Sequence, residues 1–142
     1  MRTSTPRRRS LLGALCAAWA ALAAAGGCGG PKFVPVSGKA TLDGQPLGGY
    51  VVTFTPDPAK GVELRMDCSA RLGQDGQYSL RSDDGFKTHK GAPPGWYKVT
   101  IWSPDDKPLP VNKIYTSIKT TTLTVEVVDK PQPGAYDLKF TR

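Results

Sequence analysis

Cys28 is the residue of this chain whose setting points most directly to chemistry. It follows the small residues 24–27 (Ala-Ala-Gly-Gly), and its thiol is a nucleophile that can be joined to a lipid. Before it lies the pattern of an export signal, with the arginines of residues 7–9 and an apolar run over residues 11–25. At about 1.5 Å per residue, this run is shorter than the roughly 30 Å hydrocarbon core of a bilayer. We therefore predict that residues 1–27 are a signal peptide that is cleaved.

The string A-A-G-G-C at residues 24–28 resembles a bacterial lipobox. The resemblance implies that the Cys28 thiol is diacylglycerated and that acyl chains such as palmitate hold the mature protein on a membrane. No Asp follows Cys28, and in this the chain resembles lipoproteins that a cell with two membranes sorts to its outer membrane. Residues 8–12 (R-R-S-L-L) match the twin-arginine pattern. Export by the twin-arginine route and export by the general secretory (Sec) route are therefore both open. The alternative is an ordinary cleaved signal whose mature chain begins near a cysteine.

Other residues that could catalyse a reaction or bind a metal lack partners in the sequence. Zinc peptidase sites and catalytic triads need histidine together with carboxylates. The chain has one histidine, His89, and its glutamates are Glu63 and Glu126. The acidic pairs at residues 83–84 and 105–106 lack the spacing of a calcium loop. We predict no catalytic residue, no metal site and no cofactor.

Two tryptophans on one predicted strand are the candidates for ligand binding. Trp96, Lys98 and Trp102 share one parity of an alternating segment whose other parity is apolar, so they should face outward. Six residues at about 3.3 Å each would separate the two tryptophan Cα atoms by roughly 20 Å, a span suited to an extended polysaccharide or peptide. The alternative is that each indole covers a neighbouring proline loop, Trp96 at residues 93–94 and Trp102 at Pro104.

Strands must position these residues, because apolar and polar side chains alternate along most of the chain. The alternating segments are residues 36–42, 50–55, 62–72, 77–81, 95–102, 120–128 and 136–140. Residues 34–56 should form an antiparallel pair that turns at residues 43–46, and residues 83–94 a polar loop. We predict an all-β fold, an antiparallel seven-stranded β-sandwich with almost no helix.

Cys68 falls on the apolar parity of residues 62–72. We therefore predict a buried thiol that acts as a small apolar residue. Cys16 lies in the predicted leader and Cys28 is assigned to lipid, so no disulfide framework is expected.

Three strings on these strands resemble the carboxypeptidase regulatory-like domains. They are V-S-G-K-A-T-L-D-G-Q-P-L-G-G-Y-V-V-T-F-T-P, L-G-Q-D-G-Q-Y-S-L and G-A-P-P-G-x-Y-K-V-T-I. The resemblance covers about residues 34–140 and implies a transthyretin-like (prealbumin-like) β-sandwich. The chain then divides into a lipoprotein signal (1–27), a lipid-anchored tether (28–33) and a carboxypeptidase regulatory-like domain (34–142).

The charge of the chain argues against nucleic acid as a partner. The stated net charge of +7 includes four arginines of the leader, and from Cys28 onward fifteen Lys and Arg face twelve Asp and Glu. The remaining basic residues are spread singly along the predicted strands and form no basic run.

These observations predict a non-enzymatic, lipid-anchored cell-envelope protein whose β-sandwich is a binding or spacer module. Its partners would be the membrane, through lipid on Cys28, and an envelope protein or polysaccharide. One alternative is a carbohydrate-binding surface module that uses Trp96 and Trp102. The less favoured alternative is a ureide hydrolase, because the hydroxyisourate hydrolases share the transthyretin-like fold. That family resembles this chain poorly at its site. It relies on several histidines, an arginine and a C-terminal Y-R-G-S tail, whereas this chain has His89 alone and ends L-K-F-T-R.

Replacing Cys28 tests the predicted anchor. Cys28→Ala removes the thiol that would carry the lipid, so metabolic labelling with a radioactive fatty acid should disappear and the leader should stay attached. The unmodified chain should be labelled and should stay with membranes after a salt wash, because acyl chains hold it by apolar burial. Equal labelling of the two chains would contradict the prediction.

Overall fold

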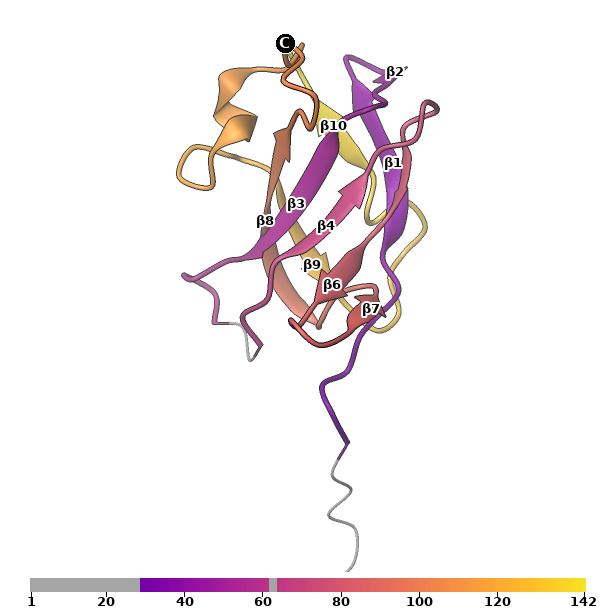
Figure 1. The fold of residues 1–142 in the computed structure, drawn as a ribbon, viewed down its shortest axis with the longest axis vertical. Coiled ribbons are helices and arrows are strands. Elements are labelled where there is room, and N and C mark those ends of the chain that lie inside the picture. The colour runs from indigo at the N-terminus through magenta and orange to yellow at the C-terminus, as the bar shows by residue number, and fades with distance from the viewer. Residues whose placement is uncertain (1–28, 62–63) are drawn as a thin grey trace, which may run out of the picture.

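The computed structural model describes residues 29–61 and 64–142. The predicted signal peptide and Cys28 lie outside these residues. The described chain forms two β-sheets, with the N-terminal segment leaving from one end of the domain and the C-terminus at the other (Figure 1). The predicted all-β architecture is confirmed, and a single 3-10 helix is the helical element of the described part.

The larger sheet has the strand order β7-β6-β4-β3-β8-β9, and the smaller has β10-β1-β2 with β5 also beside β1. The described residues hold ten strands, so the predicted count of seven is not confirmed. The elements in chain order are β1 (Ser37–Leu42), β2 (Gln45–Pro46), β3 (Val51–Pro56), β4 (Cys68–Arg71), β5 (Gln77–Ser79), β6 (Arg81–Asp83), β7 (Thr88–Lys90), β8 (Gly95–Trp102), η1 (Lys113–Thr116), β9 (Thr124–Val127) and β10 (Leu138–Phe140).

The predicted pairing within residues 34–56 is wrong. The chain reverses at residues 43–46 as expected, but the strand that follows is the short β2. The next strand, β3, lies in the larger sheet between β4 and β8. Leu47, which follows β2, is buried, and the chain passes from the smaller to the larger sheet between β2 and β3. Alternation reveals that β1 and β3 each have an inner face, but those faces belong to opposite sheets.

The predicted antiparallel order is wrong at β1 and β10, which pair in parallel with Ala40 opposite Leu138. The preceding strand, β9, belongs to the larger sheet. The chain therefore crosses between sheets before β10 begins, and it enters the smaller sheet in the direction of β1. Parallel neighbours need such a crossover, whereas a hairpin yields antiparallel ones.

Two further segments differ from their predicted form. Residues 77–81 divide between the sheets, because β5 pairs with β1 while β6 pairs with β4 and β7. Leu80 joins the two halves: its N–H donates to the carbonyl of Val36 at 2.9 Å, and its own carbonyl accepts from Gly91 N at 2.8 Å. The predicted loop at residues 83–94 contains β7, which forms a hairpin with β6.

The strand predicted over residues 62–72 is shorter in the structure, where β4 is four residues long. Residues 62–63 lie outside the described residues. The neighbouring strand explains why β4 does not begin before Cys68. β3 ends at Pro56, which has no N–H to donate to residues ahead of Cys68. The next N–H, that of Asp57, donates to the carbonyl of Trp96 on β8 at 2.9 Å and not toward β4.

Cys68 is fully buried, as its parity predicted. Its Sγ accepts a hydrogen bond from Ser82 Oγ at 3.0 Å. Burial in this setting raises the pKa of the thiol, which disfavours the reactive thiolate. The prediction of a buried apolar-like cysteine is confirmed.

Aromatic side chains join the two sheets. Phe54 on β3 is fully buried, and its ring centroid lies 6.2 Å from that of Tyr97 on β8 and 6.2 Å from that of Tyr78 on β5. Tyr115, on η1, closes one end of the core with its ring edge against Phe140 at 5.2 Å. Such tilted and edge contacts are favourable because they oppose ring faces to ring edges.

Gly38 lets β1 pass close to the segment before β10. A Cβ at this position would lie 2.3 Å from the carbonyl oxygen of Tyr136 and 3.2 Å from the ring of Tyr78. The Tyr78 hydroxyl donates to the same carbonyl. The absence of a side chain at Gly38 therefore permits this three-way contact.

Gly38→Ala should destabilise the domain, because the added methyl group would collide with backbone that has no room to shift. We expect a loss of about 1–3 kcal/mol in the free energy of unfolding, measured by urea denaturation. Lys39→Ala, a change at the exposed neighbour on β1, is the matched control and should stay within about 0.5 kcal/mol of the unmodified protein. Equal stability of Gly38→Ala and the control would contradict the packing described here.

Candidate functional site

The outer face of β8 carries the predicted ligand-facing residues. Tyr97, Val99 and Ile101 are fully buried, so the predicted inward register is confirmed. Trp96, Lys98, Thr100 and Trp102 point to the other side of the larger sheet. Their surroundings differ, however, and the structure does not join them into one patch.

Trp102 is the accessible indole of this face. It lies at the end of β8, opposite Val51, and 48% of its surface is exposed. Its Nε1–H donates to Thr53 Oγ1 at 3.3 Å, which orients the ring over β3. The ring therefore offers an oriented, partly exposed surface, whereas the alternative placed it against Pro104.

Trp96 lies at the other end of β8 and is partly covered. The ammonium of Lys60, from the loop after β3, sits 3.5 Å from the centroid of its ring, a cation–π contact. The backbone of Asp57 bonds to that of Trp96 and holds this loop in place. A loop therefore covers part of Trp96, and the residue over its ring is Lys60, whereas the alternative named the prolines of residues 93–94.

Lys98 lies between the two tryptophans and is tied down. It is opposite Thr55 on β3 and Thr124 on β9. Its Nζ donates to the carbonyl of Ile118 at 3.4 Å, in the turn that follows η1. This bond draws the turn toward the outer face of the sheet.

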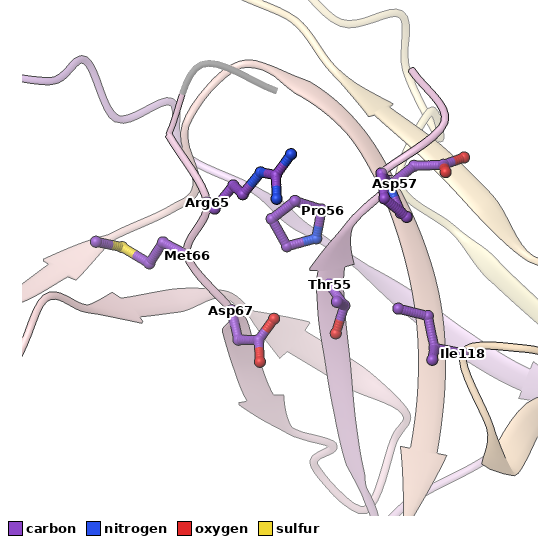
Figure 2. A pocket seen from close by; sticks show the side chains of 8 residues that line it. Thr55, Pro56, Asp57, Arg65, Met66, Asp67 and Ile118 are labelled. Carbon is purple, nitrogen blue, oxygen red and sulfur yellow. The ribbon is translucent and has the colours of Figure 1, made fainter. Parts of the chain in front are cut away.

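A pocket of about 330 Å³ opens at the end of β3, and its lining includes Ile118, whose carbonyl Lys98 contacts. Figure 2 shows Arg65 and Asp67 on one side of it, Thr55 and Pro56 in the middle, and Ile118 on the other side. Its remaining lining residues are Asp57, Pro58 and Met66. Because these residues come from three separate segments, no spacing in the sequence could have revealed the pocket.

Hydroxyl side chains fill the face between Trp102 and this pocket. Ser69, Thr53 and Thr100 are cross-strand neighbours on β4, β3 and β8, and Thr55 follows on the same side of β3. Neighbouring strands lie about 4.8 Å apart, so these groups form a closely spaced array of donors and acceptors. Such an array suits an extended polar ligand lying across the strands.

His89 has a structural setting away from this face. Its Nε2 is 2.8 Å from Asp84 Oδ2, and its ring stacks on Phe33 with centroids 3.9 Å apart. The bond to His89, together with the amides of Phe86 and Lys87, lowers the pKa of Asp84 to about 2. Through these contacts the imidazole holds the turn between β6 and β7 in place.

Comparison with protein-family models, with curated proteins and with solved structures finds no match for the chain. Within residues 29–61 and 64–142, no three His, Cys, Asp or Glu side chains are grouped so that they could hold a metal ion. The same part of the chain contains no helix with the length and apolar character needed to cross a membrane.

The two indoles should differ in their access to a quencher. In a Trp19→Phe background, Trp96→Phe leaves Trp102 as the emitter and Trp102→Phe leaves Trp96. Acrylamide should quench Trp102 more strongly, because Lys60 covers part of the Trp96 ring. Adding Lys60→Ala to the chain that retains Trp96 should raise its Stern–Volmer constant. Equal constants for Trp96 and Trp102 would contradict the placement of Lys60.

Proposed function

We propose that this protein is a non-enzymatic, lipid-anchored cell-envelope protein whose two-sheet domain is a binding or spacer module. The finer fold that we propose is the transthyretin-like sandwich of the carboxypeptidase regulatory-like domains. The two sheets and their shared apolar core support this fold but do not identify a ligand.

The outer face of the larger sheet is the observation that carries the binding role. It combines the half-exposed ring of Trp102, an array of hydroxyl groups, and a pocket with both Arg65 and Asp67. Flat aromatic surfaces flanked by hydrogen-bonding groups suit polysaccharides and extended peptides. An envelope polysaccharide or protein is therefore the partner class that we propose.

The anchor in this proposal is lipid on Cys28, which is separated from the domain by a short tether. Val34 is already paired with Ala92 in the structure, so the tether between lipid and fold is only residues 28–33. Fully extended, five steps of the chain span at most about 18 Å, which would keep the domain close to the membrane. We place the protein in the cell envelope, at the outer membrane where the cell has two, after export by the general or the twin-arginine route.

Carbohydrate binding is the more specific version of this proposal. The exposure of Trp102 favours it. Because Lys60 lies over the ring of Trp96, Trp102 is the ring that we expect to stack on a sugar. Ureide hydrolysis is the less favoured alternative, since it would need catalytic groups around His89. That imidazole belongs to β7 and lies against Phe33 and Asp84.

A binding assay with an envelope extract and a glycan panel tests the module. If Trp102 stacks on the ligand, Trp102→Ala should weaken capture by about 2- to 10-fold, because one aromatic contact is worth about 0.5–1.5 kcal/mol. Lys139→Ala, at an exposed position of β10 in the smaller sheet, is the control and should bind as the unmodified protein does. Capture that is unchanged in Trp102→Ala, or absent in all three proteins, would contradict binding at this face and would leave the spacer role.

A further inference from the structure

The turn between β6 and β7 presents Phe86 to solvent. Its exposed fraction is 101%, whereas Trp102 and Ile114, the other large apolar side chains exposed in the described part of the chain, reach 48% and 36%. A phenylalanine that stays exposed gains nothing from burial when the domain folds, so its ring can still gain by burial against another apolar surface. The side chain makes no contribution to the core of the domain.

The turn is built to hold Phe86 outward. Gly85 adopts φ 84°, a conformation that suits glycine at the first position of a two-residue hairpin loop. The carboxylate of Asp84 accepts bonds from the N–H groups of Phe86 at 2.9 Å and Lys87 at 2.7 Å. Its other oxygen bonds to His89 at 2.8 Å, which ties the turn to β7. Phe86 is thus displayed on an ordered turn.

The same turn lies at the end of the domain from which the N-terminal segment departs. Phe33, at the start of the domain, stacks on His89 of β7. Figure 1 shows the N-terminal segment leaving beside β7, with the C-terminus at the opposite end. Three chain steps separate His89 from Phe86, so their Cα atoms are at most about 11 Å apart, and Cys28 is at most about 18 Å from Phe33. A membrane that holds Cys28 is therefore within reach of Phe86.

Charge around the turn is nearly balanced. Asp83 and Asp84 are accompanied by Arg81, Lys87 and Lys90, all five are exposed, and one positive charge is left over. Nearer the tether, Lys32 pairs with Asp129. A strongly basic patch would indicate anionic lipid, whereas a nearly balanced turn with an exposed aromatic tip suits the boundary between head groups and acyl chains.

We propose that Phe86 enters the interface of the bilayer to which the chain is anchored, and so forms a second membrane contact beside the lipid of Cys28. This inference rests on the proposed lipid anchor. Two contact points at one end fix the orientation of the domain. The outer face of β8 would then stand at a defined angle to the membrane, and the β1–β2 turn would point away from it.

An environment-sensitive fluorophore on an introduced cysteine tests the contact. The full-length lipoprotein is purified with Phe86→Cys, labelled with nitrobenzoxadiazole and reconstituted in phosphatidylcholine vesicles. Native Cys68 is buried and should not react. Gln45→Cys, at the exposed start of β2, is the matched control. The probe at residue 86 should emit at a shorter wavelength than the control, and lipids brominated near the head group should quench it more.

A second pair of proteins separates the role of Phe86 from that of the probe. With the fluorophore on Lys87→Cys, emission should be blue-shifted while Phe86 is present and should return toward that of the control in Phe86→Ser. Raising the salt concentration should leave the blue shift in place, because the contact is apolar.

Flotation of the vesicles distinguishes the two levels of the proposal. If the proteins float but the probes at residues 86 and 87 match the control at residue 45, the membrane contact of Phe86 is refuted and the lipid anchor stands. If the unmodified protein does not float, the lipid anchor is refuted and the contact falls with it. Blue-shifted, quenchable probes on floating protein support both.

Discussion

The smaller sheet depends on the contacts that the carbonyl oxygen of Tyr136 makes. Gly38 approaches it too closely for any side chain, and the hydroxyl of Tyr78 donates to it. Burial raises the pKa of Tyr78, which favours the protonated hydroxyl that donates this bond. One oxygen therefore holds together β1, β5 and the segment that leads into β10. Through Phe54, the ring of Tyr78 also connects this group to the larger sheet.

Because the inner side of β8 is locked into that core, its outer side chains have defined positions. Nothing in β8 itself distinguishes Trp96 from Trp102, since both occupy outward positions of one regular strand. Loops supply the difference: Lys60 lies over one ring, and the other stays half-exposed beside Thr53. The proposed binding face is consequently asymmetric, with an aromatic surface at one end and a charged pocket at the other.

The only histidine of the chain illustrates how a chemically versatile residue can have a structural setting. His89 joins the start of the domain to the β6–β7 turn through Phe33 and Asp84. This network couples the point where the chain emerges to the shape of the turn that displays Phe86. The membrane-proximal end of the domain in our proposal is thus an ordered surface, and the tether is limited to the few residues before Phe33.

Local patterns in the sequence determined which side of each strand faces inward, because a period of two reports the burial of single residues. The burial of Cys68, the outward position of Trp102 and the reversal after Leu42 follow from such patterns. The partners of each strand depend on contacts between distant segments, which alternation does not encode. The parallel entry of β10 beside β1, the division of residues 77–81 between two sheets and the pocket beside β3 were therefore decided by the tertiary structure alone. The cover over Trp96 belongs with them, since a cation on a loop far along the chain reaches that ring only once β3 and β8 are paired.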